Sequence, residues 1–188
     1  MNQALSADSS AAINRVGEPW TGHLRRTLSG LRKERRRPLR LAIVGLGDQN
    51  RGDDGAGCCV LDELAQLRCD RLLLRDGEGG LAEIVADLLH FVPDVVLLID
   101  AGRFGIKPGA VRWLPWQDVL ADVAPGQQDS LLAPLTGTIR AQLGCPVVVL
   151  GIQCRQSIVP DYMTPTVARA AFHLASRLGE LLPHFVYV

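Results

Sequence analysis

The sequence predicts an α/β fold, a three-layer sandwich in which a twisted, mostly parallel sheet lies between helices on both faces. Short apolar runs rich in Val, Ile and Leu are continuous rather than alternating, which is typical of strands covered on both faces. Segments with apolar residues at three- and four-residue spacing separate these runs, and such alternation favours a parallel sheet. The 188 residues, 47% of them hydrophobic, suit one domain with its own core.

Each element is predicted from its own pattern. The buried strands are expected over 39–46, 71–75, 95–99 and 146–150, with an edge strand over 111–114. Helices are expected over 56–67, 80–89 and 166–182. The last of these follows Thr164 and Pro165, a typical N-cap with proline at the first helical position. In a parallel sheet of this kind, ligand sites gather at the carboxyl ends of the strands.

The front of the chain differs from the rest. Residues 1–38 are polar and include seven arginines and lysines between Arg25 and Arg37, closed by Pro38. We expect a basic, flexible N-terminal extension, with residues 39–188 forming the domain. No aromatic residue interleaves the basic ones, so a solvated, partly helical segment is favoured over one that binds RNA or an acidic partner.

Composition limits the function classes. Lys plus Arg and Asp plus Glu both number 20, which gives no general case for nucleic acid. No apolar run reaches eighteen residues, and the N-terminus lacks the basic and apolar regions of a signal peptide. We therefore expect a cytoplasmic protein without membrane insertion. The five cysteines include no CxxC pair, which favours reduced, packed thiols over disulfides or a zinc site.

Aspartates stand at the ends of two predicted strands. Asp53 and Asp54 lie in the glycine-rich turn after the first strand, and Asp100 follows the run 95–99 directly. Taken singly, each is explained as a helix or turn cap, and Asp53 is assigned that role. Taken together, Asp54 and Asp100 form a pair that adjacent strands could bring to one bound cation.

The same glycine-rich turn invites comparison with nucleotide sites. After Gly45 and Gly47, the third glycine of a dinucleotide-binding turn would stand where the chain has Asn50. No Gly-Lys-Ser/Thr follows, so the phosphate loop of nucleotide triphosphatases is excluded as well. The neighbouring carboxylates would also repel a phosphate at short range. The turn therefore favours a metal over a phosphate, and Cys58 and Cys59 behind it are expected to pack into the base of the helix.

These residues resemble the hydrogenase maturation proteases, which trim the C-terminal tail from the large subunit of nickel-iron hydrogenases. The matching pieces, in order, are Val44–Gly47 with Arg51–Gly57, Asp76–Gly77, Leu97–Ala101, Lys107–Gly109, Leu150–Gln153 and Tyr162–Val167. They span nearly all of residues 40–182 and look closest to the branch that serves multisubunit, membrane-associated or formate-linked hydrogenases. The resemblance implies a phosphorylase/hydrolase-like sandwich, which agrees with the fold predicted from the residues alone.

The resemblance also implies a function. A monomeric, aspartyl-type endopeptidase without a serine or cysteine nucleophile would recognise nickel in the large-subunit precursor and remove its C-terminal peptide. Asp54 and Asp100 fall on the family's two carboxylate positions and would be the catalytic residues and metal ligands. The nickel would be carried by the substrate rather than held permanently, and it could polarise the scissile carbonyl or supply a bound hydroxide.

The chain departs from the family at the third ligand, a histidine. Aligning Pro134 and Leu135 places Leu131 at the histidine position, and no histidine occurs between His90 and His173. Asp129 is the candidate for a third oxygen ligand. Asp48 also replaces the family's usual asparagine after the glycines. Two further hypotheses stay open: a non-proteolytic assembly factor that binds the hydrogenase large subunit, and an unrelated metal-binding regulator that acts through the basic extension.

Overall fold

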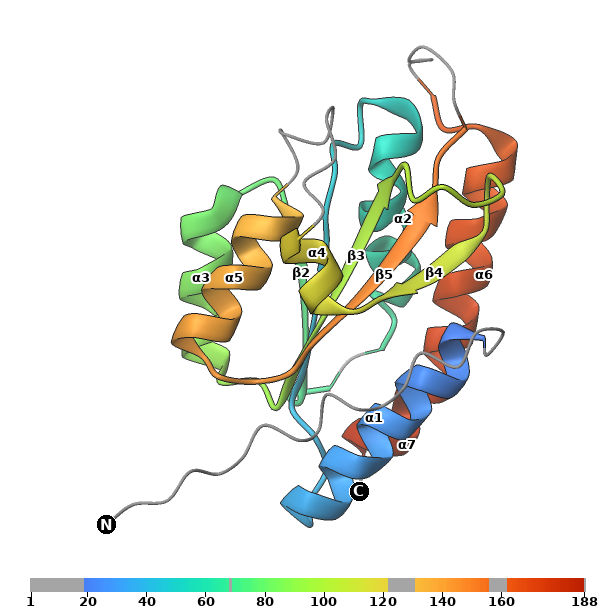
Figure 1. Cartoon of the computed structure of the whole chain (residues 1–188). Coiled ribbons are helices and arrows are strands. Elements are labelled where there is room, and N and C mark those ends of the chain that lie inside the picture. The colour runs from blue at the N-terminus through green and yellow to red at the C-terminus, as the bar shows by residue number, and fades with distance from the viewer. Residues whose placement is uncertain (1–18, 68, 122–130, 156–161, 188) are drawn as a thin grey trace.

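The computed structural model describes residues 19–67, 69–121, 131–155 and 162–187, which form one five-stranded sheet with helices on both faces (Figure 1). The strand order is β2-β1-β3-β5-β4. The strands are β1 (Leu41–Gly45), β2 (Leu72–Asp76), β3 (Val95–Gly102), β4 (Val111–Leu114) and β5 (Val147–Gln153). The first three and β5 run parallel, and β4 pairs antiparallel with β5. The predicted α/β sandwich with a mostly parallel sheet is confirmed.

All five predicted strands are present, including the edge strand over 111–114. The predicted end of the third strand is corrected, because β3 continues through Asp100 to Gly102. The extension follows from pairing: β5 runs on to Gln153, so Asp100 lies opposite Gly151 and Gly102 opposite Gln153. Asp100 is therefore a strand residue near the carboxyl end of the sheet rather than the first residue after the strand.

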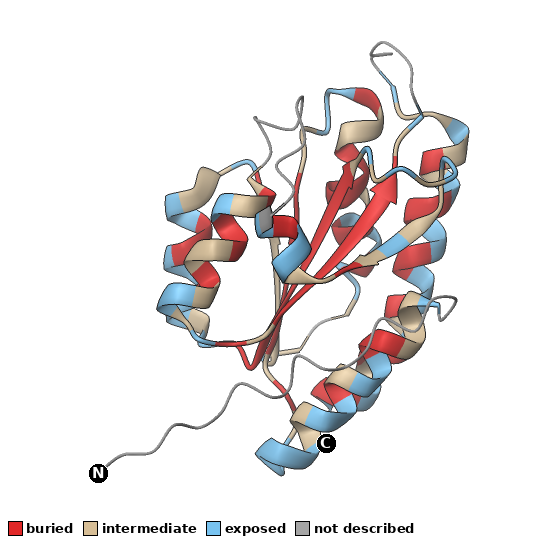
Figure 2. Ribbon diagram, viewed as in Figure 1, coloured by how far each residue is buried: buried red, intermediate tan, exposed pale blue. Residues whose placement is uncertain are grey.

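The helices cover the two faces of the sheet in separate groups. They are α1 (Trp20–Arg35), α2 (Ala56–Leu64), α3 (Gly80–Phe91), α4 (Trp116–Ala121), α5 (Leu132–Gln142), α6 (Pro165–Leu181) and α7 (Pro183–Val186). One core cluster joins the sheet to α1, α2, α6 and α7, and the other joins it to α3, α4 and α5. Figure 2 shows the central strands buried between the two layers. The predicted helices correspond to α2, α3 and α6. Helix α1 lies in the segment expected to be partly helical, whereas α4, α5 and α7 were not predicted.

The structure corrects the predicted extension over residues 1–38 in its second half. Trp20–Arg35 is a helix whose Leu24 and Leu28 are completely buried in the first core cluster. Arg32 donates to the backbone oxygens of His184 and Tyr187, which fastens this helix to the C-terminal segment. The basic residues lie on the exposed side of the helix, so their density in the sequence concealed an apolar stripe. Residues 1–18 lie outside the described part of the chain.

Candidate functional site

The loop that leaves β1 is packed so closely that two of its glycines have no room for a side chain. Gly47 has φ +107°, and a Cβ there would lie 1.9 Å from the backbone oxygen of Asp54. At Gly57, in the first turn of α2, a Cβ would lie 2.3 Å from Leu46 O and 2.7 Å from Ile99 O. The first turn of α2 therefore packs against the ends of β1 and β3. A single 3-10 turn, η1 (Gly52–Gly55), precedes α2 in the chain.

Asp54 lies in η1 and is held by its own loop. Its Oδ2 accepts a hydrogen bond of 2.9 Å from the backbone N–H of Asp48. Within the described residues its second oxygen, Oδ1, accepts no hydrogen bond. One side of the carboxylate is thus fixed by the backbone, and the other remains able to take a ligand.

Asp100 reaches the same edge of the sheet from β3. The neighbouring Ile99 accepts a 2.8 Å backbone hydrogen bond from Leu46, which ties the end of β3 to the loop after β1. Asp100 itself is 4% exposed. Its strand lies between β1 and β5, so the carboxylate stands at the middle of the carboxyl edge, where ligand sites of parallel sheets are found.

The thiol of Cys154, just beyond β5, reports on these charges. Burial is the main reason that its pKa is raised to about 12, and the negative charges of Asp53, Asp100 and Asp54 raise it further. Three carboxylates from two segments of the chain therefore lie near one thiol, since charge effects of this kind act at short range. The predicted pair, Asp54 and Asp100, lies at the same edge of the sheet, and its role in catalysis or metal binding stays a prediction.

Asp53 has a different role from the predicted local cap. Its Oδ1 accepts a 2.7 Å hydrogen bond from the N–H of Thr164, and its Oδ2 accepts one of 3.2 Å from the N–H of Arg155. Neither η1 nor α2 has a side-chain cap, so the prediction was wrong. Asp53 instead joins the segment after β5 to the start of α6. Thr164 does occupy the N-cap position of α6, but its hydroxyl is buried without a hydrogen bond.

Two further residues, Gln153 and Phe104, shape this edge and could not be predicted from the sequence. The side-chain oxygen of Gln153 accepts hydrogen bonds from the N–H groups of Phe104 (2.8 Å) and Ile106 (3.2 Å). The ring of Phe104 lies over Gly151, where a Cβ would come within 2.5 Å of it. The pattern Leu150–Gln153 was noticed as a motif, but nothing in it indicates a partner nearly fifty residues away.

The third ligand position is apolar. Leu131 occupies the N-cap position of α5 and packs against the second core cluster. Asp129 lies outside the described residues, so its suggested role stays a prediction. Within the described residues, no group of three or more His, Cys, Asp or Glu side chains is placed to hold a metal ion. The described chain therefore offers the carboxylates of Asp54 and Asp100 but no complete ligand set.

The histidines and the neighbouring cysteines do not fill this position. His23 is buried and stacks on Trp113 at 5.4 Å, away from the carboxyl edge, on α1. Cys58 packs at the base of α2, with Sγ 3.7 Å from Gly47 O, as predicted. Burial raises its pKa to about 11, so the thiol is neutral near pH 7 and is no nucleophile. All five cysteines are free.

Known proteins with similar sequences share one activity in their names. No family model matches the chain. A protein of Methanocaldococcus jannaschii, provisionally named a hydrogenase maturation protease, is 27% identical over 124 residues, covering 64% of this chain and 80% of its own length. The hydrogenase 3 maturation protease of Escherichia coli K12 is 24% identical over 111 residues, 59% of this chain and 70% of its own. The curated relatives of this chain are hydrogenase maturation proteases.

Solved structures of maturation proteases have the same fold. The nickel-iron hydrogenase maturation protease HycI from Thermococcus kodakarensis matches with a TM-score of 0.72 at 24% identity, covering 85% of this chain and 98% of that one. A crystal structure of a hydrogenase 3 maturation protease matches with a TM-score of 0.63 at 24% identity, covering 76% of this chain and 91% of that one. The chain thus has the α/β fold of the maturation proteases. No helix in the described part of the chain is long and apolar enough to cross a membrane.

Proposed function

We propose that this protein is a maturation endopeptidase that recognises nickel in the large-subunit precursor of a nickel-iron hydrogenase and removes its C-terminal peptide. The single observation that supports the proposal is that Asp54 and Asp100 both lie near the Cys154 thiol at the carboxyl edge of a maturation-protease fold. Both side chains offer oxygen ligands suited to a divalent ion, and among the described residues one oxygen of Asp54 accepts no hydrogen bond.

In this proposal the nickel belongs to the substrate. The protein supplies two carboxylates, and the precursor supplies the remaining ligands, so the incomplete ligand set of the described chain suits an ion that arrives already bound. Contact with the carboxylates would place the ion to polarise the scissile carbonyl. Cleavage would then depend on nickel loading. The five free cysteines suit a reducing compartment, and we place the activity in the cytoplasm.

One observation favours a second candidate, a non-proteolytic factor that binds the large subunit during assembly. Leu131 offers no ligand, and the described residues contain no three-membered metal-binding group. A site with two carboxylates would still contact the nickel of the precursor. It would hold the ion less firmly than three ligands and could fail to activate the peptide bond.

The test is a cleavage assay with a nickel-loaded large-subunit precursor. Release of the C-terminal peptide is followed by mass spectrometry for the natural protein, Asp54→Asn and Asp100→Asn. Asparagine keeps an oxygen for the Asp48 N–H, so the loop at Asp54 is preserved. We expect each substitution to slow cleavage at least about a hundredfold, as typically follows the loss of an electrostatic or general acid-base contact. Asp70→Asn, an exposed aspartate before β2, is the matched control.

Each result has one meaning. Association without cleavage selects the assembly factor. Cleavage that survives both aspartate substitutions refutes the site, and equal cleavage of nickel-free precursor refutes nickel recognition. Circular dichroism of each variant shows whether lost cleavage reflects lost folding.

A further inference from the structure

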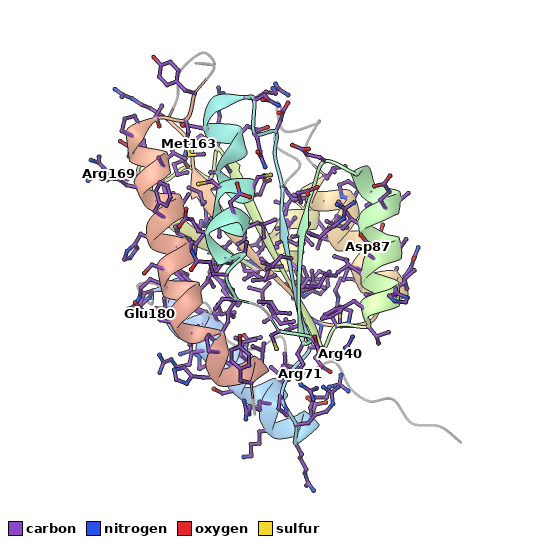
Figure 3. The ribbon with its side chains drawn as sticks, turned by 180° about the vertical axis from the view of Figure 1, so that it is seen from behind. Arg40, Arg71, Asp87, Met163, Arg169 and Glu180 are labelled. Atoms are coloured by element: carbon purple, nitrogen blue, oxygen red, sulfur yellow. The ribbon has the colours of Figure 1, made fainter. Side chains whose placement is uncertain are left out.

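Strand β2 forms an open edge of the sheet. It pairs with β1 on one side, and the strand order places no strand on its other side. All five of its residues are half-buried, unlike those of the fully buried β1. Figure 3 views the molecule from the β2 side of the sheet, with α2 and α3 on its two faces. Leu72 and Leu74 pack toward α2, and Leu73 packs toward α3.

The outward backbone groups of β2 follow from two hydrogen bonds at its ends. Leu41 N–H donates to Arg71 O, and Gly77 N–H donates to Gly45 O, both at 2.8 Å. In a parallel ladder alternate residues face the same neighbour, so the odd-numbered residues of this segment bond β1. Leu72, Leu74 and Asp76 therefore direct their N–H and C=O groups away from the sheet.

These outward groups are mostly unpaired. Leu72 N–H is used within its own turn, donating to Cys69 O at 2.9 Å. Among the described residues, the N–H and C=O groups of Leu74 and Asp76 have no hydrogen-bond partner. The opposite edge strand, β4, contacts α1, where the ring of Trp113 is stacked on His23. Unprotected edge strands are sites where another chain adds a strand.

Negative charge gathers along this edge. The guanidinium of Arg75 contacts three carboxylates: Asp76 at 3.3 Å, Glu83 at 3.1 Å and Asp87 at 2.8 Å. The last is a close ion pair rather than an aligned hydrogen bond. Three negative charges against one positive leave an excess of two. All three side chains are exposed, Asp76 by 44%, Glu83 by 67% and Asp87 by 50%, so they face solvent and would favour a positively charged partner.

The edge also leads to the candidate site. The carboxyl end of β2 lies beside that of β1, whose loop carries Asp54, and neighbouring strands are only about 4.8 Å apart. A peptide lying along β2 would reach the carboxyl edge of the sheet within a few residues. There it would approach Asp54, which lies in the loop after β1. This continuity distinguishes the β2 edge from β4, which is separated from β1 by two strands.

We propose that the β2 edge binds an extended, basic segment of the partner protein as an added strand and so presents it to Asp54 and Asp100. The identity of the partner, the hydrogenase large-subunit precursor, rests on the function proposed above. Leu74 and Asp76 supply two donors and two acceptors, enough to fix the register of about three partner residues. The carboxylates of Asp76, Glu83 and Asp87, which surround Arg75, favour basic side chains in the added strand.

Amide hydrogen exchange of Leu74 and Asp76 tests the strand directly. The isotope-labelled Asp100→Asn variant is mixed with nickel-loaded precursor, so that the complex persists. We expect exchange at these two amides to slow at least about tenfold on binding. The amides of Leu73 and Arg75 already belong to the β1 ladder and should change little.

Substitutions at Leu74 separate the backbone from the side chain. Leu74→Pro removes the outward N–H without removing a bond to β1, and Leu74→Ala shortens the side chain while keeping the N–H. Precursor affinity should be about tenfold lower for the proline variant than for the alanine variant, as expected from the loss of one backbone hydrogen bond. Glu83→Gln with Asp87→Asn should weaken binding further at low salt and less at high salt. If Leu74→Pro unfolds, the exchange experiment still decides.

The outcomes separate the two proposals. If the precursor is bound or cleaved while amide hydrogen exchange at Leu74 and Asp76 stays unchanged, strand addition is overturned and the proposed function stays intact. If these amides are protected without precursor, and the protection increases with protein concentration, a second copy of this chain occupies the β2 edge. That result also overturns the proposal. Absence of any binding of nickel-loaded precursor by the natural protein overturns both proposals.

Discussion

Removing the Asp53 carboxylate should loosen the segment between β5 and α6. One side chain accepts two backbone N–H groups from positions 102 and 111 residues further along the chain. The bond to Thr164 is short and partly buried, and we assign it about 1.5 kcal/mol, while the longer, exposed bond to Arg155 is worth about 0.5–1 kcal/mol. Relief of repulsion with the nearby aspartates returns on the order of 0.5 kcal/mol. Asp53→Ala should therefore lower the free energy of unfolding by about 1.5–2 kcal/mol.

Two measurements check this magnitude. Urea unfolding followed by circular dichroism should show a lower midpoint with an unchanged slope, because the surface exposed on unfolding stays the same. Trypsin cleavage after Arg155 should accelerate about tenfold or more, since local opening becomes easier. Asp53→Asn keeps one acceptor and should lose about 1 kcal/mol. A loss below about 0.5 kcal/mol for Asp53→Ala, or one equal to that of the exposed control Asp70→Ala, would refute the assignment.

Three further predictions concern the body of the domain. Val92 follows the last turn of α3 with φ +51° and is 68% exposed. Val92→Gly should therefore raise the free energy of unfolding by about 0.5–1 kcal/mol, measured in thermal or urea melts. Val92→Ala should not raise it. Asp94 is 4% exposed, pairs with Arg35 and Arg37, and accepts the Arg40 N–H. Asp94→Ala should lower the free energy of unfolding by about 3 kcal/mol in the same melts. A decrease under about 1 kcal/mol would contradict this prediction. Burial raises the pKa of the Cys58 and Cys145 thiols to about 11 and that of Cys154 to about 12. The rate at which these thiols are alkylated, measured by peptide mass spectrometry, should therefore rise about tenfold per pH unit from about pH 8 to 10. A plateau of the rate by about pH 9 would contradict this.

The sheet could be predicted from the sequence because its central strands, β1, β3 and β5, are buried on both faces. Continuous apolar runs have no other ready explanation, and each run became a strand. The helix α1 was hidden, although Leu24 and Leu28 stand at helical spacing and are fully buried. Its arginines and lysines dominate the composition, and a local pattern does not show that the C-terminal segment supplies a packing surface. Helix α5 was missed because Pro134 and Gly137 interrupt its apolar stripe.

The candidate site could be predicted only in part. Asp54 and Asp100 were found from a rule of topology, that parallel strands end at the same edge. The partners of Asp53 and Gln153 could not be found, because backbone N–H groups carry no sequence signature and both contacts join distant segments. The histidine position was located by resemblance alone. Leu131 packs into the core there, which periodicity could not distinguish from an exposed position.

The crowding at Gly47 has a consequence for how this site can evolve. Every other amino acid carries a Cβ, and at this position any Cβ would meet the backbone of Asp54. No single codon change can replace the glycine and leave the loop where it is. Among the described residues, the side chain of Asp48 bonds just the Asn50 N–H, which an asparagine oxygen could accept equally well. The loop can therefore change its charge at Asp48 while the glycine keeps its path fixed.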